Sequence, residues 1–125
     1  MKEGPSIAEI AALMGDPARA NMLGALMSGR ALTAGELARE AGITAQTASG
    51  HLARLSEAGL LLVEAQRRHR YFRLSGPDVA QVLEGLMGLA ARTGRLRTRT
   101  GPRDPDMRRS RVCYDHMAGE WAVNL

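Results

Sequence analysis

Apolar residues recur at helical spacing near the start of the chain. The members of this pattern are Ile7, Ile10, Ala11 and Met14. Steps of three and four place them on one face of a helix, and Ser6 directly before them is a favourable N-cap. Asp16 and Pro17 then predict a second helix, with Asp16 as its N-cap and Pro17 at its first position, which runs to a stop at Ser28-Gly29.

Two further helices are predicted in the middle of the chain, with a short glycine-containing turn between them. The first begins after Thr33, with Glu36 as its capping-box partner, and ends at Ala41-Gly42. The second begins after Thr44 and runs from residue 45 to residue 58. A helix, a turn of about three residues and a second helix form a helix-turn-helix, whose second helix can enter the major groove of DNA.

The pattern changes to short strands after this unit. Leu60 to Val63 is predicted to be a buried strand, Arg70 to Leu74 a second strand, and Ala65 to His69 the tip of the hairpin between them. A long helix follows, for which Asp78 is the predicted N-cap. Its apolar positions are Val79, Val82, Leu83, Leu86, Leu89 and Ala90.

Composition supports a small, mainly helical, DNA-directed protein. The chain has 125 residues, which suits one domain, and only 3% of them are aromatic, so its core must consist of Leu, Ala, Val and Met. The net charge is +4. Residues 1–91 hold nine basic and nine acidic side chains, whereas residues 92–111 hold eight arginines against two aspartates. A local basic excess favours nucleic acid or an anionic surface as partner, and the alternative is a solvated tail.

The order of elements resembles the winged helix-turn-helix domain of the arsenic-repressor (ArsR/SmtB) family of bacterial transcription regulators. The matching stretches are GDPARANMLGALMSG and LTAGELAREAGITAQTASGHLARLSEAGLLLVEAQRRHRYFRLS. The similarity extends from about Ile7 to Ala91 and follows the family patterns "DPxR…IL", "ELA…S.HL..L..aGL" and "R.G…yyrL". The resemblance implies a mainly α fold with a small two-stranded β-hairpin, the wing, and a dimer that binds DNA.

The known sensing sites of the family do not carry over to this chain. Metal-sensing members carry cysteines beside the "EL" of the first helix of the helix-turn-helix, where residues 32–37 here contain none. Members that sense zinc at the dimer helix carry Asp and His pairs, but residues 79–91 contain no His. The usual glycine of the wing is replaced by Arg67. No cofactor is therefore expected, and the effector is unknown.

The start of the second helix of the helix-turn-helix is the predicted DNA-reading surface. Ala48, Leu52 and Leu55 are expected to point inward. The groove side is then formed by Gln46, Thr47, Ser49, Gly50 and His51. Glutamine can pair with adenine, and serine or threonine can contact bases or phosphates. The alternative is that the hydroxyl groups are only solvated and that His51 packs at the turn.

Arginines at the hairpin tip are the second predicted DNA contact. Four arginines lie between residues 67 and 73, and Arg67, Arg68 and Arg70 are at or beside the tip. Guanidinium groups in this position can enter a narrow minor groove or hold phosphates, whereas a solvated turn needs no such cluster. Because contacts to phosphates release counterions, DNA binding should weaken steeply with salt.

The resemblance places a homodimer interface on the first and last helices of the domain. Its candidate residues are Ile7, Ile10, Met14, Val82, Leu86 and Leu89. The alternative is that these side chains belong to an ordinary monomer core. Gly85 and Gly88 in the last helix would permit close approach of another helix.

The remainder of the chain is expected to form a linker and one more helix. We divide the sequence into a winged helix-turn-helix domain at 1–92, an Arg/Pro/Gly-rich linker at 93–105 and a helix at 106–125, which is a possible start of a longer region. Cys113 and His116 form C-x-x-H and could be half of a metal or redox site shared across a dimer. The alternative is a small buried thiol and a capping histidine.

These features favour a sequence-specific DNA-binding transcriptional regulator, a repressor that binds a palindromic operator as a homodimer. The alternative is a protein-interaction module that docks an acidic partner. No arrangement typical of an enzyme is present, so no catalytic residues are expected. A single cysteine favours the reducing cytoplasm, and no apolar run long enough to span a membrane is found.

Overall fold

Capping side chains set the helix boundaries of the computed structural model, which describes residues 3–97. Helix α1 (Ile7–Gly15) begins where the Ser6 hydroxyl accepts a hydrogen bond from the N–H of Glu9, at 3.2 Å. Helix α2 (Pro17–Ala25) begins where the Asp16 carboxylate accepts from the N–H of Arg19, at 3.0 Å. Both N-caps satisfy N–H groups that have no partner inside the helix, as the sequence predicted.

Strand β1 (Leu32–Thr33) leads directly into helix α3 (Ala34–Ala41), and helix α4 (Ala45–Glu57) follows after a turn. Thr33 and Glu36 form the predicted capping box at the start of α3. Gly42 ends α3 with a φ of 67°, a left-handed conformation that glycine adopts without steric cost. The helix-turn-helix is therefore present with the boundaries that its capping residues indicated.

The hairpin belongs to a sheet of three antiparallel strands in the order β1-β3-β2. Strands β2 (Leu61–Gln66) and β3 (His69–Leu74) pair over their full length, from Leu61 opposite Leu74 to Gln66 opposite His69. The sequence predicted two strands. The third, β1, has only two residues, too few to show an alternating pattern, and it pairs Leu32 with Phe72.

Two predictions about this half of the chain were wrong in detail. The first strand is buried only at its start, because Leu62 and Val63 are 42% and 43% exposed where the hairpin leaves the core. Helix α5 (Pro77–Arg92) begins earlier than Asp78: its N-cap is Gly76, and Pro77 occupies the first turn. Proline is favourable there because its missing N–H would have had no helical partner.

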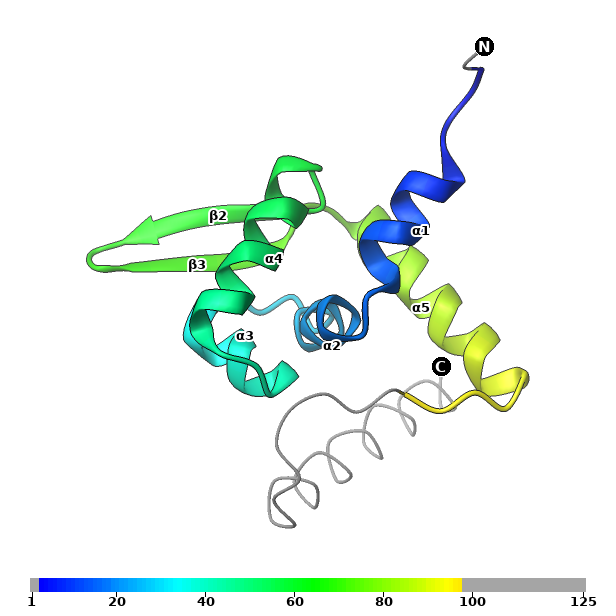
Figure 1. The fold of residues 1–125 in the computed structure, drawn as a ribbon. Coiled ribbons are helices and arrows are strands. Elements are labelled where there is room, and N and C mark those ends of the chain that lie inside the picture. The colour runs from blue at the N-terminus through cyan, green and yellow to red at the C-terminus, as the bar shows by residue number, and fades with distance from the viewer. Residues whose placement is uncertain (1–2, 98–125) are drawn as a thin grey trace.

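The core lies where α2, α3 and α4 meet the base of the sheet. Its largest fully buried side chains are Met22, Leu23, Leu26, Leu37, Leu52 and Leu55. Phe72 on β3 is a buried aromatic residue within this core, and Val79 and Leu83 attach α5 to it. Figure 1 shows the hairpin extending to one side of the helices, with α1 and α5 at the opposite side.

Candidate nucleic-acid interface

Helix α4 lies beside the base of the hairpin (Figure 1). One face of this helix is polar and exposed to solvent. Ala48, Leu52 and Leu55 are completely buried against the rest of the domain. Gln46, Thr47, Ser49 and Gly50 are all exposed on the other side of the helix. Side chains of this size with amide and hydroxyl groups can approach base edges and phosphates.

The first turn of α4 is held by two threonine hydroxyl groups. The Thr44 hydroxyl accepts from the N–H of Thr47 at 3.1 Å and lies 2.9 Å from the Thr47 hydroxyl, to which it donates. The Thr47 hydroxyl therefore keeps its own proton available for an external acceptor such as a phosphate oxygen. These hydrogen bonds hold the first turn of α4, which carries Gln46 and Ser49.

His51 differs from its four neighbours in the predicted DNA-reading set. Its side chain is only 22% exposed. Its Nδ1 atom lies 3.1 Å from Nη1 of Arg19, and its Nε2 atom lies 3.9 Å from Oδ2 of Asp16. The sequence pattern predicted no role for Arg19. The only signal that could have indicated one was the presence of Asp16 and Arg19 together in the "DPxR" stretch.

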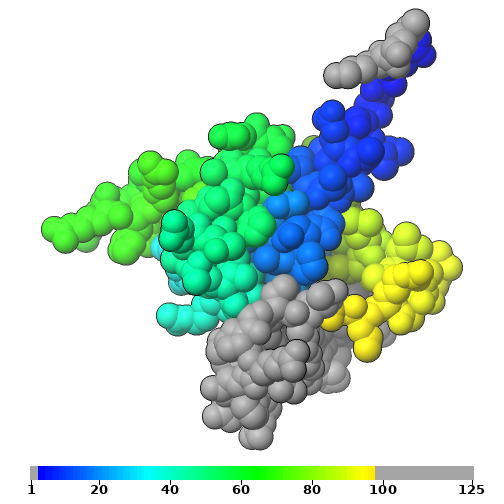
Figure 2. All heavy atoms as spheres, viewed as in Figure 1, coloured from blue at the N-terminus to red at the C-terminus, as the bar shows by residue number. Residues whose placement is uncertain are grey.

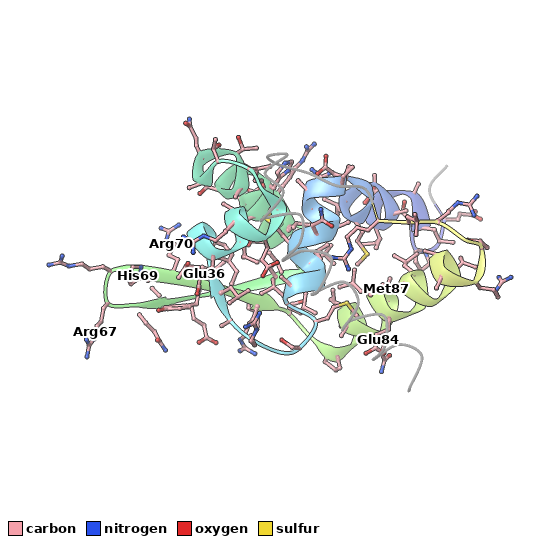
Figure 3. All side chains as sticks on the ribbon, turned by 90° about the horizontal axis from the view of Figure 1, so that it is seen from below. Glu36, Arg67, His69, Arg70, Glu84 and Met87 are labelled. Carbon is pink, nitrogen blue, oxygen red and sulfur yellow. The ribbon has the colours of Figure 1, made fainter. Side chains whose placement is uncertain are left out.

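The hairpin projects from the body of the molecule as a narrow ridge (Figure 2). Arg67 and Arg68 form the loop between Gln66 and His69, and Arg70 is the second residue of β3. All three arginines are exposed, and none forms an ion pair within residues 3–97. Figure 3 shows Arg67 and Arg70 reaching out on opposite sides of the ridge.

The loop has an unusual backbone at Arg67. The φ of this residue is 57°, and it is the one residue other than glycine with a positive φ in the described part of the chain. A two-residue hairpin loop requires positive φ, which is why glycine or asparagine is usual there. Arg67 therefore adopts the glycine-like conformation that the loop requires.

The fourth arginine of the cluster has a different environment. Arg73 donates from Nε to Oε1 of Glu64 across the hairpin, at 2.9 Å. Both side chains are exposed, so the pair contributes at most about 1 kcal/mol to stability. Arg73 is therefore neutralised near the base of the hairpin, whereas the positive charge of Arg67, Arg68 and Arg70 remains at the tip.

Two helix-capping carboxyl groups are held in the ionised form. The N–H of Arg19 donates to Asp16 and, as the largest effect, holds the pKa of that carboxyl below its usual range. The N–H of Thr33 does the same for the pKa of Glu36. Hydrogen bonds to the charged form of a carboxyl stabilise that form.

Apolar side chains of α1 and α5 are left exposed at the end of the domain opposite the hairpin. Ile7 and Ile10 on α1 are 84% and 38% exposed. On α5 the exposed members of this set are Val82, Leu86 and Leu89, each close to half exposed. Met14, which the helical spacing grouped with them, lies in the protomer core with only 5% exposure because it packs where α1 turns into α2.

The C-terminal candidates lie outside the described residues. Cys113 and His116, the helix expected at 106–125 and most of the arginine-rich stretch belong to residues 98–125. Within residues 3–97, no cluster of three or more His, Cys, Asp and Glu side chains could hold a metal ion. In the same part of the chain, no helix has the length and apolarity that a membrane span requires.

Comparison with known proteins identifies the kind of domain. A family model described as "Helix-turn-helix domain" matches residues 14–64, which include α2, α3 and α4. The solution structure of Mb0332 from Mycobacterium bovis, described as a homodimeric winged helix-turn-helix DNA-binding domain, has a TM-score of 0.60. The identity is 22%, and the match covers 72% of this chain and 91% of that one.

The chain contains a winged helix-turn-helix domain. In this fold the hairpin, here β2–β3, is named the wing, and the second helix of the helix-turn-helix, here α4, is named the recognition helix.

Two further matches concern regulators of transcription. An HTH-type transcriptional regulator of Bacillus subtilis, YdfF, is described as uncharacterized and is 44% identical over 121 residues. The match covers 97% of this chain, which spans 54% of the length of that relative. A crystal structure of a predicted DNA-binding transcriptional regulator from E. coli has a TM-score of 0.59 at 27% identity, and covers 66% of this chain and 86% of that one.

Proposed function

We propose that this chain is a sequence-specific DNA-binding transcriptional regulator of the ArsR/SmtB type, which represses transcription from a palindromic operator in the cytoplasm. The observation that supports this most directly is the exposed polar face of the recognition helix, next to a wing whose tip carries three arginines without ion pairs among the described residues. Homology to an HTH-type regulator supports the same function.

The recognition helix and the wing have different tasks in this proposal. Gln46, Thr47, Ser49 and Gly50 lie in the major groove, where the amide of Gln46 reads a base and the hydroxyl groups contact bases or phosphates. Arg67, Arg68 and Arg70 contact phosphates or the adjacent minor groove. Reading of sequence therefore depends on uncharged side chains of the recognition helix, and electrostatic attraction depends on the wing.

A second copy of the chain covers the exposed apolar faces of α1 and α5. Ile7, Ile10, Val82, Leu86 and Leu89 provide an apolar surface that a monomer leaves in water. A Cβ added at Gly85 or Gly88 meets no atom of the described residues within 4 Å apart from its own turns of α5, so these glycines leave open space for a partner helix. The solution structure of Mb0332 is described as homodimeric, which supports the same assembly here.

Two matched variants test the division of tasks. Binding is measured by mobility shift with DNA from upstream of the gene for this chain and with a scrambled duplex, over a range of salt. Arg68→Ala should weaken binding to both duplexes by similar factors and reduce the salt slope by about 0.9 for each phosphate that is no longer neutralised. Gln46→Ala should weaken only the upstream duplex, by about 1–3 kcal/mol, because the variant cannot pair with the base that the glutamine amide reads.

Other outcomes are informative. An unchanged salt slope in Arg68→Ala would remove the wing from the interface. Wild-type binding that is equal on both duplexes, or absent, would instead favour a protein-interaction module whose arginines dock an acidic partner.

A further inference from the structure

One partly buried polar connection joins the recognition helix to the helices that precede it. Arg19, in the first turn of α2, uses three of its nitrogen atoms for three different acceptors. Nε donates to the carbonyl oxygen of Leu13 at 2.6 Å, Nη2 to that of Ala12 at 3.1 Å, and Nη1 to Nδ1 of His51 at 3.1 Å. These acceptors belong to α1 and α4, so one side chain of α2 contacts both.

The contacts to α1 satisfy its C-terminal end. The last four carbonyl groups of a helix have no partner within it, and Ala12 and Leu13 belong to this turn of α1. A positive charge is favourable there because it complements the helix dipole. Helix α1 has no basic residue in its own last turn, and Arg19 supplies the charge from α2.

The contact to α4 fixes the orientation of a histidine ring. A guanidinium group carries only donors, so Nδ1 of His51 must be the acceptor and the ring proton lies on Nε2. Nε2 lies 3.9 Å from Oδ2 of Asp16. Asp16 in turn accepts from the N–H of Arg19, which ties the N-cap of α2 into the same cluster.

We propose that Arg19 is a positioning residue that holds the recognition helix in a fixed orientation relative to α1, through His51. This inference rests on the proposed DNA-binding function. In the proposed dimer, α1 belongs to the interface, which sets the spacing of the two recognition helices, and α4 belongs to the DNA surface, which reads bases. Arg19 therefore connects the dimer interface to the DNA surface. His51 is then the residue through which the recognition helix is bound to Arg19 of α2.

The test separates positioning from simple stabilisation and from charge. Arg19→Met retains much of the apolar stem and removes all three hydrogen bonds. The ratio of affinity for the upstream duplex to affinity for the scrambled duplex should fall about tenfold, because hydrogen bonds that involve a charged group are the stronger ones and the orientation of α4 depends on them. Binding to the scrambled duplex should change little. Arg19→Lys should not restore the ratio, since an ammonium group cannot span three acceptors as a planar guanidinium does.

His51 provides the second arm of the experiment. His51→Leu removes the acceptor and should lower the ratio as Arg19→Met does, and the double variant should be no worse than either single one. His51→Asn places an amide oxygen near the position of Nδ1 and should restore most of the ratio. The nitrogen-15 shift of Nδ1 in the free wild-type chain should report the hydrogen bond that this atom accepts from Arg19, and the shift should move in Arg19→Met because that donor is lost.

Two control variants keep the result interpretable. Ser75→Ala removes a hydrogen bond to the carbonyl of Gly59 at 2.7 Å, away from the cluster, and should lower stability without changing the ratio. Arg30→Met removes an exposed positive charge on the loop before β1 and should leave the ratio unchanged. An unchanged ratio in Arg19→Met, with a wild-type chain that does discriminate, would overturn the positioning role alone. A wild-type chain that does not discriminate would overturn the proposed function and the positioning role with it.

Discussion

Replacement of Arg67 by glycine should make the wing more stable and a weaker DNA contact at the same time. The backbone of Arg67 has a φ of 57°, where a residue with a side chain is strained by roughly 1–2 kcal/mol. Glycine removes that strain but gains freedom in the unfolded chain, which offsets about 0.4–1 kcal/mol. The expected net gain for Arg67→Gly is therefore about 0.5–1 kcal/mol.

The assay is thermal unfolding without DNA, at fixed protein concentration, followed by circular dichroism. For a domain of this size, the expected gain corresponds to a rise in Tm of about 2–8 °C. Arg68→Gly is the matched control, because Arg68 belongs to the same loop and carries the same charge but has no positive φ. It should lower Tm slightly.

DNA binding by the same two variants should change in the same direction. Each lacks one arginine per chain, so each should bind more weakly at low salt and show a flatter salt dependence. A fall in Tm for Arg67→Gly, or the same change in Tm for Arg67→Gly and Arg68→Gly, would refute the assignment of strain to Arg67. That result would mean that the arginine side chain stabilises the loop by contacts of its own.

Four other substitutions test separate parts of the structure. Leu86→Lys places a charge on the exposed face of α5, and we expect a folded monomer in sedimentation analysis; a dimer of unchanged affinity would contradict the proposed interface. Met14→Ala should lower the free energy of unfolding by about 2–5 kcal/mol because Met14 is in the core, whereas Ile7→Ala should affect association only; similar effects on unfolding would place both residues in one environment. The pKa of Asp16 is lowered in the folded state, so its ionised form stabilises the fold above the ordinary carboxyl range and this contribution disappears as pH falls through the lowered pKa. Asp16→Asn should consequently be destabilised at neutral pH in urea unfolding and approach the wild type as the pH falls below the ordinary range of a carboxyl, and a difference that grows toward low pH would reverse the assigned sign.

Local signals were sufficient to predict most of the helices. Asp16, Thr33 and Thr44 cap helices as expected, because a short polar side chain before an apolar repeat satisfies free N–H groups wherever the helix lies in the fold. Gly42 ends α3 for an equally local reason, the left-handed backbone. These features depend on neighbours within four residues.

Features that depend on distant residues were missed. Strand β1 exists because Leu32 and Thr33 lie beside Phe72 and Tyr71, about 40 residues away in the sequence, and two residues carry no pattern of their own. Leu62 and Val63 were predicted to be buried from their composition, but the hairpin extends beyond the helices that could cover them. Burial of a strand depends on what packs on it, which a single run of apolar residues does not reveal.

The candidate site also combines features that local patterns predict with features that depend on distant residues. Burial of Ala48, Leu52 and Leu55 follows from helical periodicity, so the exposure of Gln46 and Ser49 could be predicted. The engagement of His51 by Arg19 joins residues 32 positions apart and has no periodic signature. Met14 likewise fits the same helical face as Ile7 and Ile10, and only the close turn into α2 places it in the core.

Selection of binding sites from random duplex DNA by the full wild-type chain tests the proposed function most directly. A dimer with two recognition helices should enrich an inverted repeat, with half-site centres separated by about 10–10.5 base pairs or a multiple of that distance. The enriched duplex should bind at least ~1000-fold more tightly than a scrambled duplex at physiological salt. A selected pool that remains random, with equal affinity for all duplexes, would contradict sequence-specific recognition by this domain.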